Sequence, residues 1–322
     1  MSEQLKPGLK PLTPTPAEAV SQPVNWQLEQ IVGELRAVRA EWRSGTGRAR
    51  ELVGRELPSR QAMANILDGL IGALFPMRLG PSNLRQESED FYVGHTLDNA
   101  LNCLLAQVRL ELAYAARQRG EEAAQDQAVA IVRDFASALP AMRRLLDSDV
   151  IAAYNGDPAA RSVDEVLLCY PGVLAVIHHR LAHHLYRAGL PLLARIAAEQ
   201  AHSATGIDIH PGAQIGHSFF IDHGTGVVIG ETAIIGNNVR IYQAVTLGAK
   251  RFTADESGQL HKGQPRHPIV EDDVVIYAGA TILGRITLGK GSTIGGNVWL
   301  TRSVPAGSNV SQASAQNQPA NL

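Results

Sequence analysis

Two acidic residues and a histidine interrupt an apolar, glycine-rich part of the chain. Asp222 and His223 are adjacent within the sequence FFIDHGTGVVIGET, and Asp208 precedes them. An imidazole whose tautomer is held by a carboxylate is the usual general base near neutral pH, so Asp208 beside His223 would form a unit for proton transfer. Each residue taken alone is also explained as a solvated corner of a repeat, and the hypothesis therefore rests on the whole set.

A period of six residues surrounds these positions. From Ile209 the chain divides into IHPGAQ, IGHSFF, IDHGTG, VVIGET, AIIGNN, VRIYQA and VTLGAK, and the period resumes at Val274 with VVIYAG, ATILGR, ITLGKG, STIGGN and VWLTRS. Apolar first and third residues with small residues at the corners predict a parallel β-helix with three hexads in each coil. Asp208 and His223 then lie nearly one coil apart, so we expect them to stack on neighbouring coils.

The residues before the repeat show helical periodicity. Apolar residues recur at three- and four-residue steps, as in Leu97, Leu101, Leu104, Leu105, Val108 and Leu112. Breaks between helices are predicted at Gly120, Pro140, Pro158, Pro171 and Gly189. The predicted fold class is α+β, with an N-terminal all-α helical domain followed by a β-helix. Proteins with this period wind left-handed, against the usual right-handed crossover rule.

Composition shifts divide the chain into four parts. The sequence predicts a disordered tail at 1–22, a helical domain at 23–202, the β-helix at 203–305 and a flexible tail at 306–322. The two stretches of hexads are out of register with each other, so a loop at 249–267 must leave the coil. We expect this long loop either to cover a site or to be an insertion without a role.

Bulk composition excludes several classes of function. The 322 residues carry a net charge of −2 without a basic face, which argues against nucleic-acid binding. We find neither a secretory signal nor an apolar run long enough to span a bilayer, so no membrane association is expected. Cys103 and Cys169 match no metal or redox spacing. We predict that both are reduced, buried thiols and that the protein is cytoplasmic.

The residues 208–248 are similar to a known enzyme family. DIHPGAQIGHSFFIDHGTGVVIGETAIIGNNVRIYQAVTLG resembles the serine O-acetyltransferases of cysteine biosynthesis, which are hexapeptide-repeat acyltransferases. The family's later R-H-P motif is matched at 266–268 and its upstream D-P-A motif at 157–159. The resemblance covers roughly residues 145–305 and is more specific than the repeat itself.

The resemblance implies a reaction and a set of residues. Acetyl would pass directly from acetyl-CoA, as co-substrate rather than bound cofactor, to the hydroxyl of L-serine, without a metal. The implied catalytic residues are His223 as general base, Asp208 as its orienting carboxylate and His267 as an oxyanion donor. The implied contacts to serine come from Asp157, Asp222 and Arg266, and those to CoA from Gly248, Ala249 and Ala278.

The resemblance also implies partners, and some alternatives stay open. Family members form homotrimers or dimers of trimers. Some bind O-acetylserine sulfhydrylase through a C-terminal Ile, where this chain ends in Leu322. Alternative functions are an acetyltransferase with another acceptor, a γ-class carbonic anhydrase, which the histidine spacing disfavours, and a silent scaffold. His179 and His183 lie four residues apart, which allows a metal site, but a partly exposed position or packing against the coil is favoured.

Overall fold

The computed structural model describes residues 25–45, 57–121, 125–250 and 263–313. The chain divides into two compact units, Met1–Gly54 and Arg55–Leu322. The predicted N-terminal tail, the middle of the predicted loop at 249–267 and the end of the C-terminal tail lie outside the described residues.

The first unit contributes one described helix, α1 (Leu28–Gly45). Its acidic first-turn residue, Glu29, and its basic last-turn residue, Arg43, both oppose the helix dipole favourably. None of its residues is buried. The predicted helical domain at 23–202 therefore extends over both compact units, because α1 belongs to the first and the remaining helices belong to the second.

The second unit begins with a helical part. Its elements are α2 (Arg60–Leu74), α3 (Pro76–Leu79), η1 (Gln86–Ser88), α4 (Glu89–Arg119), α5 (Gln125–Gly156), α6 (Val163–Cys169), α7 (Pro171–Arg187) and α8 (Pro191–Thr205). Local signals set several of these bounds. Ser59 caps α2 by accepting the N–H of Ala62 at 3.2 Å. Gly120 ends α4 in the left-handed conformation at φ 71°, as its lack of a Cβ allows.

Four of the five predicted helix breaks are confirmed, and one is wrong. Pro140 lies inside α5 and does not end it. Its side chain is exposed, while Phe135 and Leu139 before it and Met142 after it are buried in the core. Packing of the apolar face on both sides outweighs the backbone hydrogen bond that proline cannot make.

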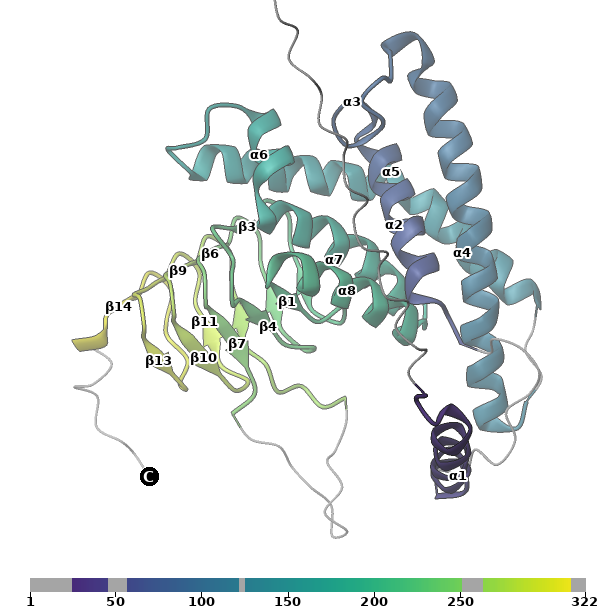
Figure 1. The fold of residues 1–322 in the computed structure, drawn as a ribbon. Coiled ribbons are helices and arrows are strands. Elements are labelled where there is room, and N and C mark those ends of the chain that lie inside the picture. The colour runs from purple at the N-terminus through teal and green to yellow at the C-terminus, as the bar shows by residue number, and fades with distance from the viewer. Residues whose placement is uncertain (1–24, 46–56, 122–124, 251–262, 314–322) are drawn as a thin grey trace, which may run out of the picture. The chain divides into compact units, whose positions relative to one another are not determined.

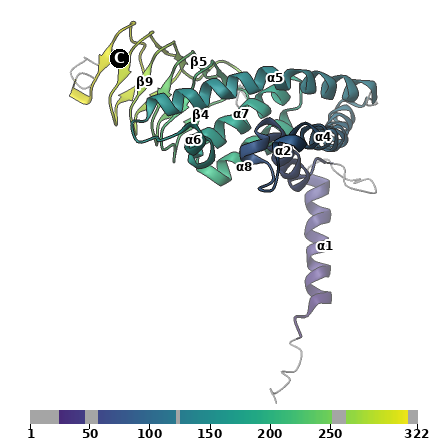
Figure 2. The ribbon, with the colours of Figure 1, turned by 90° about the horizontal axis from the view of Figure 1, so that it is seen from above.

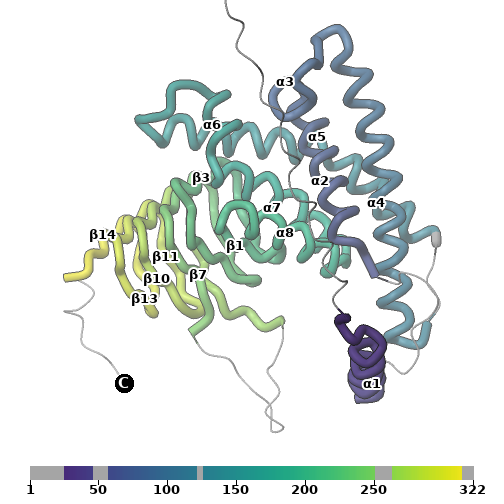
Figure 3. The backbone as a smooth tube through the Cα atoms, in the orientation of Figure 1, coloured from purple at the N-terminus to yellow at the C-terminus, as the bar shows by residue number. Residues whose placement is uncertain are grey.

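The β-helix is built from short parallel strands. They are β1 (Asp208–Ile209), β2 (Gln214–Ile215), β3 (Phe220–Ile221), β4 (Val228–Ile229), β5 (Ile234–Ile235), β6 (Arg240–Ile241), β7 (Thr246–Gly248), β8 (Ile269–Val270), β9 (Val275–Ile276), β10 (Thr281–Leu283), β11 (Thr287–Leu288), β12 (Thr293–Ile294), β13 (Trp299–Leu300) and β14 (Asn309–Val310). Successive coils stack these strands into three sheets. Figures 1 and 3 show the coils lying next to one another.

Strand order within the sheets confirms the coil. The three sheets run β1-β4-β7-β10-β13, β2-β5-β8-β11 and β3-β6-β9-β12-β14, so each of the first four coils adds one strand to each sheet. The last coil adds β13 and β14 and reaches the β2 sheet only by the isolated bridge between Leu288 and Val304. This is the left-handed parallel β-helix that the period predicts. Helix α8 continues to Thr205, past the predicted boundary at 202, and the last strand lies beyond the predicted end at 305. The coil already resumes at β8, before Val274.

The hexad register places the predicted apolar residues in the interior. Val227 and Ile229, at the first and third places of one hexad, are 0% and 1% exposed, and this pattern continues to Val298 and Leu300. One first place is polar. Ser292 is fully buried, and its hydroxyl donates to the carbonyl of Pro305 at 3.0 Å, which satisfies the buried oxygen.

Helices α5, α7 and α8 contact the first coils (Figures 1 and 2). Gly172 of α7 lies so close to β3 that a Cβ there would meet the carbonyl oxygen of Ile221 at 2.2 Å. The buried guanidinium of Arg180 on α7 pairs with Asp149 on α5 at 3.0 Å and also donates to backbone carbonyls of the coil, including that of Gly216. Since these groups are desolvated, the pair fixes how helices and coil meet.

The two cysteines and the membrane-spanning potential of the helices are the next features that the sequence analysis addressed. Cys103 and Cys169 are free thiols but exposed, so the prediction that they are buried is wrong. Both lie on outward faces of their helices, where no partner element covers them. Within the described residues, no helix is both long and apolar enough to cross a membrane.

Candidate active site

Two edges of the β-helix carry most of the polar residues that the sequence singles out. Turns from the β3 sheet to the β1 sheet form one edge, which includes Asp222 and His223 and is called the His223 edge. Turns from the β1 sheet to the β2 sheet form another, which includes Glu231 and the end of the 249–267 loop and is called the His267 edge. The sheet β1-β4-β7-β10-β13 lies between them.

His223 projects from its edge into solvent. The residue adopts a left-handed backbone at φ 59°, and its side chain is 71% exposed. A non-glycine residue in this region is uncommon and occurs where the surrounding turn imposes it. The neighbouring Asp222 carboxylate is largely buried, and one of its oxygens lies 3.9 Å from Nε2 of His223. The imidazole is thus accessible to a substrate while carboxylates surround it.

Asp157 reaches the same edge from the end of α5. One carboxylate oxygen accepts the N–H of Ala159 at 2.8 Å, and the other accepts the hydroxyl of Tyr170 at 2.5 Å. These hydrogen bonds, first that of Tyr170 and then that of Ala159, lower the pKa of Asp157. The same contact with Asp157 raises the pKa of Tyr170 to about 12. Tyr170 therefore remains a donor, and Asp157 remains a carboxylate near neutral pH.

Arg240 completes this edge. It donates to Asp222 at 2.9 Å and lies over the rings of Phe220 and Tyr242, with 5.0 and 4.8 Å between its guanidinium carbon and the ring centroids. Its Nε is buried without a hydrogen-bond partner among the described residues. The carboxylate of Asp222 is therefore already half of an ion pair with Arg240.

The His267 edge holds its imidazole differently. His267 is 7% exposed, and the backbone N–H of Thr232 donates to its Nδ1 at 3.0 Å. Because Nδ1 accepts, the neutral ring carries its proton on Nε2. Burial first, and then the charge of Arg266, lowers the pKa of His267 to about 4. The ring is thus a neutral N–H donor at physiological pH.

Arg266 is held by a carboxylate that the sequence reading did not single out. Glu231 accepts from Arg266 at 2.7 Å and from the hydroxyl of Tyr186 at 2.9 Å. Burial raises the pKa of Glu231, but the bonds from Arg266 and Tyr186 outweigh it, and the net shift is downward. The hydroxyl of Thr232 accepts the backbone N–H groups of Arg266 and His267, at 2.9 and 3.1 Å, which fixes the loop end.

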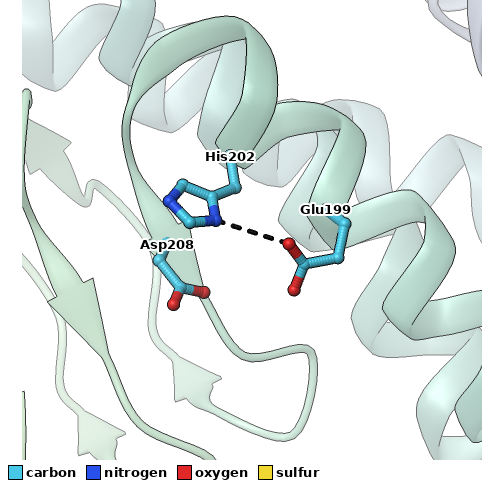
Figure 4. A group of neighbouring side chains, drawn as sticks. All are labelled: Glu199, His202 and Asp208. Carbon is cyan, nitrogen blue, oxygen red and sulfur yellow. Dashed lines mark hydrogen bonds and ion pairs between the residues drawn. The ribbon is translucent and has the colours of Figure 1, made fainter.

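Asp208 lies on β1, between the two edges, with the helix α8 beside it. Figure 4 shows its carboxylate near His202 and Glu199, whose donor atoms all lie within 4.8 Å of one another. His202 Nδ1 is 3.4 Å from Glu199. Such a set can hold a divalent cation, but Glu199 also pairs with Arg195, whose charge competes with a metal. Among the described residues, no hydrogen bond joins Asp208 and His223.

The residues expected to contact CoA also divide between the edges. Gly248 ends β7 and Ala249 follows it on the His267 edge, and Ala278 lies in the turn after β9 on the His223 edge. A Cβ at Gly248 would lie 2.9 Å from Leu283, so the backbone surface there depends on a small residue.

The structure thus brings some predicted site residues together and keeps others apart. Asp157, Asp222 and His223 meet at one edge, and Arg266 and His267 meet at the other. Within the part of the chain that the structure describes, neither a hydrogen bond nor an ion pair joins one group to the other. One chain therefore presents a base with carboxylates and, separately, a cation with a neutral N–H donor.

Several residues at these edges escaped the sequence reading. Glu231 and Thr232 lie in the G-E-T-A part of the family motif, which was the available signal. Arg240 occupies the outward second place of the hexad VRIYQA, where any polar residue is tolerated, and Tyr170 precedes a proline at a helix start. Neither position shows its role without the fold. The expected packing of His183 on the coil is confirmed, because it contacts the carbonyl of Pro211 at 2.8 Å.

The chain is similar to known proteins over most of its length. Residues 267–302 match the family model for the bacterial transferase hexapeptide (six repeats). The chain is 63% identical over 262 residues to the plasmid serine acetyltransferase of Synechococcus elongatus, covering 80% of this chain and 82% of that protein. Among solved structures, serine acetyltransferase 1 of Entamoeba histolytica in complex with L-cysteine is 40% identical, with a TM-score of 0.67 over 77% of this chain and 86% of that chain.

A second solved structure gives the same result. Serine acetyltransferase isoform 3 of Entamoeba histolytica, in complex with cysteine, is 37% identical with a TM-score of 0.63, covering 80% of this chain and 81% of that chain. Identity at this level over most of both chains extends beyond the repeat to the helices that support the site. The chain therefore belongs to the serine acetyltransferases, a family of hexapeptide-repeat acyltransferases.

Proposed function

We propose that this protein transfers acetyl from acetyl-CoA to the hydroxyl of L-serine, giving O-acetyl-L-serine and CoA. The observation that carries the proposal is the His223 edge, where an accessible imidazole lies beside the carboxylates of Asp157 and Asp222. A serine ammonium group suits these carboxylates, and its hydroxyl then falls within reach of a base.

In the proposed mechanism His223 removes the hydroxyl proton as the serine oxygen attacks the thioester carbonyl. A carbon–oxygen bond forms, the tetrahedral oxyanion collapses, and the carbon–sulfur bond breaks. The proton on His223 passes to the departing sulfur, so His223 returns to its neutral form and CoA leaves as a free thiol. Asp208 is proposed to orient the imidazole from the neighbouring coil. This role requires a side-chain rotation toward His223, because its present neighbours are Glu199 and His202.

Arg266 and His267 are proposed to complete the site from a second copy of the chain. The guanidinium suits the serine carboxylate, and the Nε2–H of His267 suits the oxyanion. Their separation from His223 within one chain supports a homotrimer in which the His223 edge of one copy meets the His267 edge of the next. CoA is then proposed to lie along Gly248, Ala249 and Ala278.

A panel of acceptors tests the proposed reaction. Release of CoA from acetyl-CoA, followed with a thiol-reactive dye, should depend on L-serine and not on other hydroxyl or amine acceptors. Release with another acceptor alone would overturn the substrate, and no release with any acceptor would favour a silent scaffold. Mixing His223→Ala with His267→Ala chains tests the shared site. Restored activity, from sites built of two intact edges, is expected for a trimer.

We also propose that cysteine competes with serine for this site. Cysteine differs from serine only at the side-chain atom, and both similar Entamoeba structures contain cysteine. Competitive inhibition against serine is the expected pattern. Inhibition that is independent of serine concentration would contradict a common site.

A further inference from the structure

Helix α1 exposes a continuous apolar face. Leu28, Ile31, Leu35 and Val38 are 62%, 44%, 50% and 60% exposed, and none of the residues of α1 is buried. Single exposed apolar residues are ordinary, but an aligned row of them marks an interaction surface. The helix belongs to the compact unit Met1–Gly54.

The row has the spacing of a coiled coil. Leu28, Leu35 and Trp42 recur every seven residues, and Ile31 and Val38 follow the first two by three. Leucine and tryptophan thus take the first position of each heptad, and β-branched residues take the fourth. This 3-4 alternation keeps a single seam facing a partner helix, as knobs-into-holes packing requires.

Charges beside the seam select an orientation. Glu34 takes the last heptad position, and Arg39 takes the fifth position of the next heptad. In a parallel arrangement these positions face each other across chains, so Glu34 of one copy meets Arg39 of another. In an antiparallel arrangement Glu34 would lie near the glutamates of its partner, Glu41 included. The charges therefore favour parallel helices of the same chain.

The residue types also favour more than two strands. Leucine at the first position with β-branched residues at the fourth shifts coiled coils from dimers toward trimers and tetramers. Val32, 47% exposed at the fifth position, widens the apolar face as a multi-stranded core needs. We propose that α1 binds the α1 helices of two other copies as a parallel three-stranded coiled coil. The number three rests on the trimer of the proposed function, whereas the parallel pairing rests on α1 alone.

Helix α1 is too short to form a stable coiled coil by itself, so the rest of the chain must hold the copies together. Its 18 residues form fewer heptads than the three to four of a self-sufficient coiled coil. Tethering to an assembly that already holds three chains raises the effective concentration to the millimolar range, which makes a weak association complete. The coil would thus tie together the N-termini of one trimer.

Disulfide cross-linking of the full chain tests the arrangement. In a Cys103→Ser/Cys169→Ser background, Leu28→Cys places a thiol on the seam, and Ala40→Cys places one on the exposed opposite face. Parallel helices bring the Leu28→Cys thiols together, whereas antiparallel ones hold them about 20 Å apart. We expect at least tenfold faster cross-linking for Leu28→Cys than for Ala40→Cys. Equal rates would overturn the proposal, as would cross-linking of Leu28→Cys only to Gly45→Cys in mixed samples.

Charge reversal and native mass provide independent readouts. Glu34→Arg should slow cross-linking several-fold, and adding Arg39→Glu should restore it, because the pair is reversed rather than broken. No recovery in the double variant would overturn the parallel pairing. A native mass other than that of three chains would overturn the three-stranded form. Acetyl transfer should be unchanged in all these variants. If the parent protein shows no acetyl transfer, the proposed function is wrong, but the cross-linking result still tests the coiled coil.

Discussion

The two edges of the β-helix hold their histidines in opposite ways. His223 stands 71% exposed at a positive φ, with carboxylates around it. His267 is buried, accepts the N–H of Thr232, and has its pKa lowered to about 4. The same side chain is thus exposed to solvent at one edge and fixed as a neutral donor at the other. Environment, and not residue type, assigns the two roles.

The charged partners differ in the same sense. At the His223 edge Arg240 balances Asp222, and Asp157 keeps a hydrogen bond from Tyr170. At the His267 edge Glu231 balances Arg266. A ligand with an ammonium at one end and a carboxylate at the other would exchange with one ion pair at each edge. This comparison leads to four predictions, from the largest expected effect to the smallest.

Removing the exposed imidazole should have the largest effect. His223→Ala is expected to lower kcat by about 10²- to 10⁴-fold, the usual contribution of a general base. His217→Ala, which removes another exposed histidine of the coil, serves as the matched control and should leave kcat unchanged. Steady-state rates of CoA release measure both. A His223→Ala enzyme with the parent's kcat would remove the basis for assigning proton transfer to this edge.

Lowering the pH should reduce the free energy of unfolding, because the imidazole of His267 is buried. An unfolded chain protonates His267 near its ordinary pKa of 6.5, but the folded chain does so only near 4, so folding stability falls as pH drops between these values. His267→Gln removes this contribution to the pH dependence of stability. Its loss of unfolding free energy between pH 7 and 4 should be about 3 kcal/mol smaller than that of the parent.

Denaturant titrations across this pH range measure the difference. Burial also lowers the pKa values of His178, His179, His183 and His210, but these act on both proteins and cancel. An identical pH dependence for parent and variant would mean that His267 is not held neutral by the fold.

A methyl group at Gly230, against the Nε2 edge of His267, should displace the ring. A Cβ at Gly230 would lie 2.0 Å from Cδ2 and 2.1 Å from Nε2 of His267, so Gly230→Ala must push the ring aside. A displacement of about 1 Å costs about 10²-fold in rate when a group acts by position. Gly94→Ala, where nothing lies within 4 Å of the new Cβ, is the matched control. Unchanged kcat in Gly230→Ala would separate His267 from the reaction.

Removing the hydrogen bond from Tyr170 to Asp157 should have the smallest effect. Tyr170→Phe removes the main cause that lowers the pKa of Asp157, so that pKa should rise toward its ordinary value. We expect KM for serine to increase about three- to tenfold with little change in kcat, since a hydrogen bond to a charged group contributes modestly. The acid limb of kcat/KM should shift to higher pH. Tyr154→Phe, within α5, controls for the loss of a tyrosine hydroxyl. Equal profiles for both variants would contradict the role.

The errors of sequence reading came from packing. Pro140 was expected to end a helix, yet α5 continues because its flanking apolar residues are buried together. Cys103 and Cys169 were expected inside because cysteine is commonly buried, but both fall on outward helix faces. Both misjudgements concern which face of an element meets a partner, and local composition does not contain that information.

What the sequence by itself determined is the coil and the identities of its unusual residues. A six-residue period is local, because each apolar residue must reach the axis in its own hexad, and the burial of Val227, Ile229 and their equivalents follows. Only the tertiary structure decided that His223 and His267 stand on different edges, that Glu231 holds Arg266, and that Nδ1 of His267 is an acceptor. Charge state and tautomer depend on burial and on partners far along the chain, which only folding brings together.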